Sequence, residues 1–150
     1  MEEGQGSNKH KVIIAPILEA ETEREKLGNE FSAIVVEEDV VVRMGHKEIL
    51  TLNGAKTCDT VGNGREATTL HLNGKRFDII LMDLDMPDDD GFNTIDTLRS
   101  LGVRSLILSV SGPCCPEIFP RLFKEVPIDG HLIKPLTVQM LGEALQKFKS

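Results

Sequence analysis

The chain has 150 residues, of which 40% are hydrophobic and 27% charged, and its formal net charge at pH 7 is −7. This length and composition predict one globular domain with a single core. The negative charge and the lack of Trp and Tyr argue against a nucleic-acid partner. No apolar run approaches the roughly 20 residues that span a bilayer, so we expect no membrane partner either.

The cysteines and the N-terminal composition bear on location and domain organisation. Cys58, Cys114 and Cys115 make an odd count without metal-ligand spacing, which favours reduced thiols in a cytoplasmic protein. No secretory signal is visible. Residues 1–30 are polar and charge-rich, so we expect a partly flexible extension, in which the stretch VIIAP could add an edge strand. The globular domain is predicted to cover residues 31–150.

From Phe31 onward, predicted strands and helices alternate. Buried, β-branched runs predict strands at 32–37, 55–61, 77–83, 105–111 and 131–134. Amphipathic spacing predicts helices at 40–54, 65–74, 92–102 and 137–148, the first three closed by glycine and the last capped by Thr137. The stretch 111–127 contains four prolines, so any helix there should be short or displaced.

This alternation predicts an α/β fold, a doubly wound five-stranded parallel sheet with helices on both faces. In such a sheet the functional crevice lies at the carboxyl ends of the strands. Polar side chains occur at four of those ends. They are Glu37, Glu38 and Asp39 after the first strand, Asp83 at the third, Ser111 at the fourth and Lys134 at the fifth.

The chemistry of this set points to phosphoryl transfer. Carboxylates about 5 Å apart repel by about 3 kcal/mol at an effective dielectric of 20, and a hard cation such as Mg²⁺ relieves that repulsion. A lysine and a hydroxyl across the crevice could hold phosphate oxygens. An aspartate placed among them can attack a phosphoryl donor and form an acyl phosphate.

The motifs VVEED, LMDLDMPDDDG, VSG and IKPL occur in this order. In these motifs the sequence from about Phe31 to Ser150 resembles the receiver domain of two-component response regulators, and most of all the plant type-C regulators, which consist of little more than a receiver. The resemblance implies a flavodoxin-like fold with strand order 2-1-3-4-5. It also implies a cytoplasmic phosphoprotein, able to enter the nucleus by diffusion, in cytokinin-type plant signalling.

The resemblance also implies roles for individual residues. Asp83 matches the phospho-accepting aspartate, Ser111 the switch hydroxyl and Lys134 the crevice lysine, followed by a cis peptide before Pro135. The metal-binding positions match Glu37, Glu38, Asp83 and Asp85, with Asp85 contributing its main-chain carbonyl to Mg²⁺. The phosphoryl donor would be a histidine-phosphotransfer protein, for which we expect a docking surface at Val40, Val41 and Met44.

Two positions depart from the receiver pattern. Glu38 stands where an aspartate is usual, and its extra methylene moves the carboxylate by about 1.5 Å. Because Mg²⁺ demands near-ideal geometry, we predict weakened or rearranged metal binding. His131 stands at the aromatic switch position, where it either fills a partly exposed slot or acts as a pH-sensitive switch.

Three functions remain open on the sequence alone. The first is a receiver that catalyses its own phosphorylation and dephosphorylation, with possible phosphohistidine-phosphatase activity. The second is a pseudo-receiver that has lost efficient phosphorylation. The third is a haloacid-dehalogenase-type phosphatase, suggested by the Asp83-x-Asp85 pattern but disfavoured by its place on the third strand.

The remaining aspartates of this block, Asp88, Asp89 and Asp90, are interpreted as a solvated turn. A calcium-binding loop starting at Asp83 is excluded because Pro87 and Asp88 would fall where a ligand and a glycine are needed.

Overall fold

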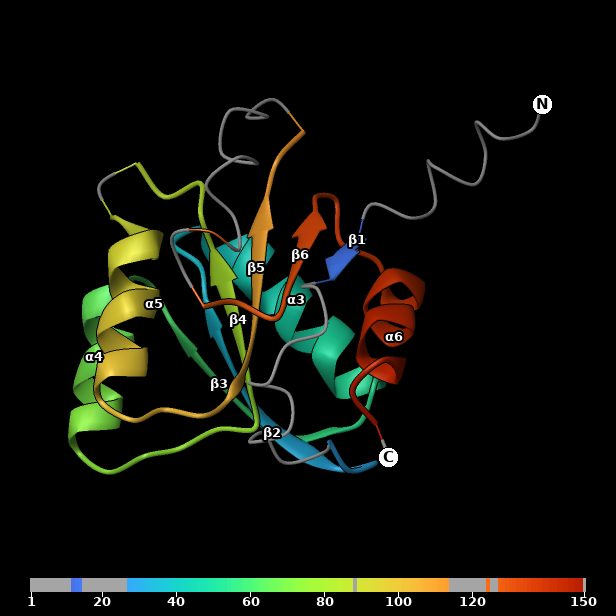
Figure 1. The fold of residues 1–150 in the computed structure, drawn as a ribbon. Coiled ribbons are helices and arrows are strands. Elements are labelled where there is room, and N and C mark those ends of the chain that lie inside the picture. Colours follow the sequence, from blue (N-terminus) through green and yellow to red (C-terminus); the bar gives the residue numbers. More distant parts are fainter. Residues whose placement is uncertain (1–11, 15–26, 88, 114–123, 125–126, 150) are drawn as a thin grey trace.

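The computed structural model describes residues 12–14, 27–87, 89–113, 124 and 127–149. Six strands and four helices lie in this part of the chain (Figure 1). The strands are β1 (Val12–Ile14), β2 (Phe31–Val36), β3 (Ala55–Val61), β4 (Ile79–Asp83), β5 (Leu106–Ser111) and β6 (Gly130–Ile133). The helices are α3 (Val40–Leu52), α4 (Gly64–Leu72), α5 (Gly91–Ser100) and α6 (Val138–Gln146).

All six strands form one sheet, in the order β1-β6-β5-β4-β2-β3. The five strands from β2 to β6 are parallel, and when they are numbered one to five along the chain their order across the sheet is the predicted 2-1-3-4-5. The doubly wound fold is therefore confirmed. The sheet departs from the prediction in having a sixth strand, β1, which pairs antiparallel with β6.

The added strand β1 comes from the stretch that the sequence interpretation allowed as an edge strand. Its residues pair in register with β6, Ile13 lying opposite His131. Leu27, also within the predicted extension, is buried and donates its backbone N–H to the carbonyl of Phe148 at 3.0 Å. Two short parts of residues 1–30 thus contact the globular body.

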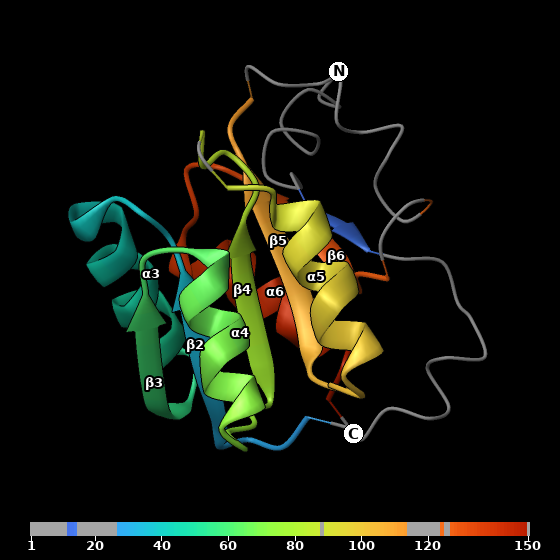
Figure 2. The same ribbon diagram turned by 90° about the vertical axis from the view of Figure 1, so that its left-hand side faces the viewer.

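The helices cover both faces of the sheet. In Figure 1, α4 and α5 lie on the left of the sheet and α3 and α6 on the right. Figure 2 shows α4 and α5 in front of the strands. Side chains of β4 alternate between the two faces. Ile79 and Leu81 pack with α3 and α6, and Ile80 and Met82 pack with α4 and α5.

Each helix begins at a polar cap, which satisfies backbone N–H groups that have no partner within the helix. Thr137 accepts from Met140 N at 3.0 Å, as the sequence predicted. Asp39 accepts from the N–H groups of Val41 and Val42, at 2.9 and 3.0 Å, so this acid caps α3.

The three helices predicted to be closed by glycine each end just before one. Gly54, Gly74 and Gly102 all have positive φ. At Gly54 a side chain would be strained by the φ of 116°, and its Cβ would lie 2.5 Å from the carbonyl oxygen of Asn29. The turn between α3 and β3 therefore requires glycine.

The predicted element boundaries agree with the structure to within two residues. The remaining differences arise because residue patterns locate an element less sharply than its hydrogen bonds do. The strand predicted from Phe77 begins at Ile79. Most of the stretch 111–127, where any helix was expected to be short or displaced, lies outside the described residues. Cys114 and Cys115 lie outside them as well. None of the helices described is long and apolar enough to cross a membrane.

Candidate phosphoryl-acceptor site

The carboxyl ends of four neighbouring strands meet at one edge of the sheet. Val36 of β2 pairs with Met82 of β4, and Asp83 pairs with Val110 of β5. Ser111 in turn pairs with Ile133, directly before Lys134. The parallel register thus brings Glu37, Asp83, Ser111 and Lys134 to the same edge, as the sequence predicted.

Lys134 lies at the centre of an acidic cluster. Its Nζ is 3.1 Å from Asp83 Oδ1, 3.5 Å from Glu37 Oε1 and 3.7 Å from Asp85 Oδ2. The Glu37 and Asp83 side chains are each 4% exposed, so these charges are almost entirely removed from water. One ammonium faces three carboxylates, and the cluster carries an excess of negative charge.

The electrostatics of this cluster shift two pKa values. Burial raises the pKa of Asp83, the backbone N–H of Asp85 opposes that shift, and the neighbouring Glu37 adds to it. Burial alone would lower the pKa of Lys134, but attraction to Asp83 and Glu37 outweighs it and raises that pKa. Lys134 therefore stays protonated, and its charge favours the ionised form of Asp83.

Backbone groups fix the orientation of the carboxylates. Asp85 N donates to Asp83 Oδ1 at 2.9 Å, and Gly112 N donates to Asp85 Oδ2 at 2.7 Å. Asp39 N donates to Glu37 Oε2 at 3.2 Å. Hydrogen bonds to carboxylates are stronger than those between neutral groups. The Gly112–Asp85 bond therefore ties the loop after β5 to the loop after β4, and the Asp39–Glu37 bond fixes the Glu37 carboxylate within the loop after β2.

Ser111 is at the site but its hydroxyl is bonded to β6. Its Oγ lies 2.8 Å from His131 Nε2, and the other ring nitrogen, Nδ1, lies 2.7 Å from Ser109 Oγ. His131 is completely buried, which corrects the expectation of a partly exposed slot. Burial lowers the pKa of His131 to about 4, so the ring is neutral at physiological pH, which argues against the alternative of a pH-sensitive switch near neutrality.

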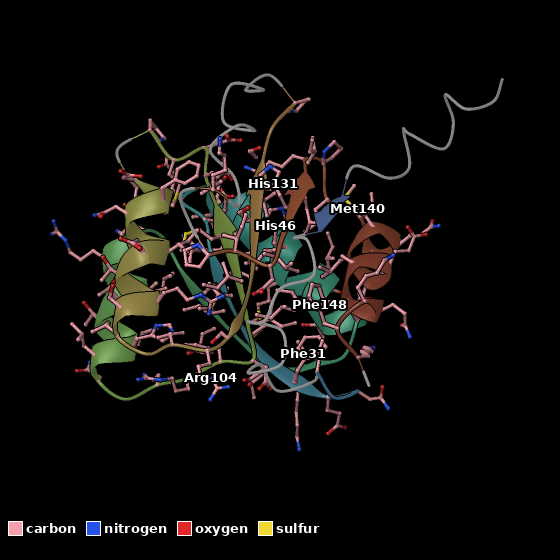
Figure 3. The ribbon with its side chains drawn as sticks, viewed as in Figure 1. Phe31, His46, Arg104, His131, Met140 and Phe148 are labelled. Atoms are coloured by element: carbon pink, nitrogen blue, oxygen red, sulfur yellow. The ribbon has the colours of Figure 1, made fainter. Side chains whose placement is uncertain are left out.

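Sequence reasoning missed a second buried histidine near the site. His46 lies on α3 and is 6% exposed. Burial lowers its pKa, Lys134 lowers it further, and Asp83 opposes the shift. Figure 3 shows His46 and His131 toward the same end of the sheet, far from Arg104, which precedes β5. Helical spacing can indicate that a residue such as His46 lies on a buried face, but it does not indicate proximity to Lys134.

Two of the aspartates after Asp85 also bond the N-termini of helices, which adds a role to their interpretation as a turn. Asp90 caps α5 by accepting from Asn93 N at 3.2 Å. Asp89 accepts from Gly64 N at 2.5 Å, at the first residue of α4. A Cβ at Gly64 would overlap the Thr94 hydroxyl, so α4 and α5 approach closely here. Asp88 lies outside the described residues.

The predicted metal ligands separate into two groups. Glu37, Asp83 and Asp85 place oxygens around one point, now held by the Lys134 ammonium. Glu38 is exposed, and no ion pair among the described residues includes it. Carboxylate oxygens are the ligands that Mg²⁺ prefers, so the three converging side chains fit this ion by their chemistry. In the arrangement described, no three acidic, His or Cys side chains are spaced to hold a metal.

The predicted docking residues form an exposed apolar surface beside this edge. Val40, Val41 and Met44 are 55%, 80% and 64% exposed, on the first turns of α3. Their helix begins three residues after Glu37, so they flank the acidic cluster. We refer to these three residues as the α3 lip.

Comparison with known proteins identifies the family and agrees with the fold. The family model described as the response regulator receiver domain matches residues 33–146. Two Arabidopsis thaliana proteins are similar. Two-component response regulator 24 is 34% identical over 79% of this chain and 84% of its own length, and two-component response regulator ARR22 is 36% identical over 71% and 75%.

Solved structures show the same fold. The receiver domain (CheY-like) from Methylobacillus flagellatus has a TM-score of 0.68 at 24% identity, covering 80% of this chain and 99% of that one. Chemotaxis response regulator CheY4 of Vibrio cholerae has a TM-score of 0.67 at 27% identity, covering 79% and 98%.

A parallel 2-1-3-4-5 sheet with a buried aspartate and a lysine at its carboxyl edge defines a receiver domain. The chain belongs to the response regulator receiver family, and it resembles the plant receiver-only, type-C members. This membership removes the haloacid-dehalogenase alternative. The predicted cis peptide between Lys134 and Pro135 is also present.

Proposed function

We propose that this protein is a phosphorelay receiver that accepts a phosphoryl group from a histidine-phosphotransfer protein onto Asp83 and later releases it as phosphate. One observation carries the proposal. Asp83 ends a buried strand with its Oδ1 3.1 Å from Lys134 Nζ, beside a second buried carboxylate. A structural ion pair needs no such excess of buried acid, because the uncompensated carboxylate costs stability.

The chemistry follows from the contacts of Asp83. Its Oδ1 accepts from Lys134 and Asp85, so we assign attack on phosphorus to Oδ2. The new O–P bond forms as the P–N bond of the donor phosphohistidine breaks, and the imidazole keeps the electron pair and takes a proton. Water later attacks phosphorus, and cleavage of the acyl O–P bond returns the carboxylate and releases phosphate.

The side chains around Asp83 would position and neutralise the phosphoryl oxygens. The Lys134 ammonium, which pairs with Asp83, can also pair with the oxygens of a phosphoryl group on Asp83. The Ser111 hydroxyl can donate a hydrogen bond to the same phosphoryl group. Glu37, Asp83 and the main-chain carbonyl of Asp85 would hold Mg²⁺, and Glu38 would contribute less to its binding. The ion, when bound, supplies positive charge that offsets the phosphoryl oxygens.

The plant relatives support a place in two-component, cytokinin-type signalling. The similar Arabidopsis proteins are named two-component response regulators. The phosphotransfer partner would meet the protein in the cytoplasm. The absence of Trp and Tyr and the net charge of −7 suit a basic protein partner better than nucleic acid.

A transfer assay with a phosphorylated histidine-phosphotransfer protein tests this function. We expect label to move to the receiver in Mg²⁺ and to be lost as phosphate over time, and chelation by EDTA should slow the transfer. An acyl phosphate is recognised by its cleavage with hydroxylamine. Loss of donor label as free phosphate, without labelled receiver, would instead indicate phosphohistidine-phosphatase activity.

A pseudo-receiver is the second candidate, and the position of Glu38 favours it. Glu38 is exposed and stands apart from the three carboxylates around Lys134. A protein in this class would bind the phosphotransfer partner but neither take up nor release its label. The same assay, with a pull-down of the partner, separates the two functions.

Glu38→Asp should strengthen Mg²⁺ binding. The shorter side chain removes the displacement of about 1.5 Å that the extra methylene imposes, and Mg²⁺ accepts little deviation from octahedral geometry. We expect a gain of severalfold in affinity, measured by calorimetry. Asp39→Glu, which changes a capping acid next to it, is the control and should leave the affinity unchanged. Equal affinities of the wild type and Glu38→Asp would refute the prediction.

The α3 lip is proposed as the docking surface for the phosphotransfer protein. Val41→Asp should weaken that complex at least tenfold, about 1.4 kcal/mol, because an interface anchor becomes a charge that must be desolvated. Leu52→Asp is a matched control, since Leu52 is 61% exposed on the same helix but at its far end. The docking proposal is wrong if Val41→Asp binds as the wild type does, or if Leu52→Asp weakens the complex equally.

A further inference from the structure

The sheet ends in an open edge at β3. Among the described strands, β3 is the last in the sheet order and pairs only with β2, as Figure 2 shows. The carbonyl of Val61 accepts from Glu37 N at 3.1 Å, so the backbone groups of Val61 face β2. Backbone groups of neighbouring residues in a strand point in opposite directions, so those of Thr60 and Cys58 face outward. These two residues therefore offer N–H and C=O groups that no described strand pairs.

The outward edge of β3 lies in a groove between two helices. Figure 1 shows α3 on one face of the sheet and α4 on the other. The groove has a volume of about 640 Å³. It is lined by Lys47 of α3, residues 58–61 of β3, and Arg65, Glu66, Thr69 and Leu70 of α4. A chain lying along β3 would contact the strand through its backbone and both helices through its side chains.

Only the beginning of β3 is protected against such pairing. Exposed edge strands are commonly blunted by lysines and bulges. Lys56 is exposed and lies in a bulge, because Ala55 and Thr57 pair with consecutive residues of β2. The groove follows the second half of the strand, beyond this bulge.

The groove carries a net positive charge. Lys47 and Arg65 form no ion pair with any described residue. Asp59 Oδ2 lies 3.1 Å from Lys75 Nζ, and Glu66 Oε1 accepts a backbone hydrogen bond at 2.9 Å. Three cations therefore face two carboxylates, on a chain whose net charge is −7. This charge suits an acidic ligand.

We propose that the groove beside β3 binds an extended acidic segment of a partner protein, which adds a strand to the sheet. The outward backbone groups of Cys58 and Thr60 pair with the segment. Adjacent side chains of a strand point to opposite faces, so two neighbouring carboxylates would meet Lys47 on the α3 side and Arg65 on the α4 side. None of the residues proposed for phosphoryl transfer or metal binding lines the groove, so this interaction goes beyond the proposed function.

An acidic peptide serves as the probe. It is an acetylated, amidated hexapeptide with two central glutamates between valine and threonine residues, and its control has lysines in place of the glutamates. Amide ¹⁵N–¹H shifts of the full chain should change at residues 58–61 and saturate. The lysine peptide should bind at least about tenfold more weakly, because like charges meet. No binding, equal binding of the two peptides, or saturation without shifts at residues 58–61 overturns the proposal.

Thr60→Pro tests the pairing of the backbone. Proline lacks the N–H and is tolerated in an edge strand where that group faces outward, so the fold should be retained. We expect this variant to lose peptide binding. Thr60→Val, which removes the hydroxyl but keeps the N–H, should bind as the wild type does. Wild-type binding by Thr60→Pro overturns the proposal. Shifts at β3 that depend on protein concentration without peptide would assign the groove to a second copy of this chain, and overturn it too.

Two charge variants keep the proposal testable if Thr60→Pro does not fold. Lys47→Glu and Arg65→Glu should each weaken peptide binding about threefold, as expected for the loss of an exposed ion pair. Arg104→Glu is the matched control, because Arg104 is exposed and precedes β5, which β4 and β2 separate from β3. It should leave the affinity unchanged. Wild-type binding by both groove variants, or an equal loss in Arg104→Glu, overturns the proposal.

Discussion

Asp83→Asn should abolish labelling by the phosphotransfer protein and, at the same time, raise the free energy of unfolding at pH 7. Asparagine keeps the shape of the side chain but provides no carboxylate to attack phosphorus, so labelling should fall to the background of the assay. The gain in stability follows from the raised pKa of Asp83, whose first cause is burial. Most loss-of-function substitutions destabilise a protein, so the opposite sign is diagnostic.

The sign follows from proton linkage. The folded-state pKa of Asp83 lies above its unfolded value, so the unfolded chain loses this proton at lower pH. The contribution to stability is present below the unfolded pKa and is lost as the pH rises through the folded pKa. At pH 7 the ionised, buried carboxylate therefore costs stability. A neutral amide removes that cost, and Lys134 keeps Glu37 and Asp85 as partners.

Chemical denaturation followed by circular dichroism measures the stability, since the chain has no Trp or Tyr to report by fluorescence. Asp89→Asn is the matched control. It makes the same change of charge in the same loop, but Asp89 accepts a hydrogen bond from Gly64 at the start of α4. This control should retain labelling and lose stability. Our assignment of the site would be contradicted if Asp83→Asn still became labelled, or if its free energy of unfolding at pH 7 were lower than that of the wild type.

The sequence was sufficient for the sheet and for the position of the acceptor. Buried strands such as Ile79–Asp83 are unbroken apolar runs, and parallel connection forces their carboxyl ends to one edge. Asp83 is the last residue of such a run, and Lys134 directly follows another. Topology alone therefore places both residues at the same edge of the sheet, where Lys134 Nζ lies 3.1 Å from Asp83 Oδ1.

Contacts between side chains were not predictable in the same way. His131 meets Ser109 and Ser111 because β5 and β6 pair in one particular register, which the residue types do not reveal. Asp39 and Asp89 belong to acidic runs in the sequence, but each accepts a hydrogen bond at the start of a helix. Asp39 caps α3, whereas Asp89 bonds the N–H of Gly64 from 25 residues further along the chain, next to the local α4 cap Asn63. A pattern of charges shows where acids are concentrated but not which backbone N–H each one meets.

Lowering the pH from 7 to 4 should cost about 3 kcal/mol of unfolding free energy through His131 alone. Burial lowers its pKa from 6.5 to about 4 in the folded protein. Between these values the unfolded chain binds a proton that the folded protein does not, so stability is lost as the pH falls through this range. The difference of about 2.5 pH units, at 1.36 kcal/mol per unit, gives the stated magnitude. Burial lowers the pKa values of His46 and His71 as well, and these act in the same direction.

Comparison with His131→Phe isolates the contribution of this ring. The variant loses hydrogen bonds to Ser109 and Ser111, so it should be less stable than the wild type at pH 7. Its free energy of unfolding, measured by urea denaturation at several pH values, should fall less steeply below pH 6.5. The ionisation of Asp83 has the opposite sign but is common to both proteins, so it cancels in the difference. Parallel curves for the two proteins would mean that His131 accepts a proton in the folded state as readily as in the unfolded one, which its complete burial between two hydroxyls opposes.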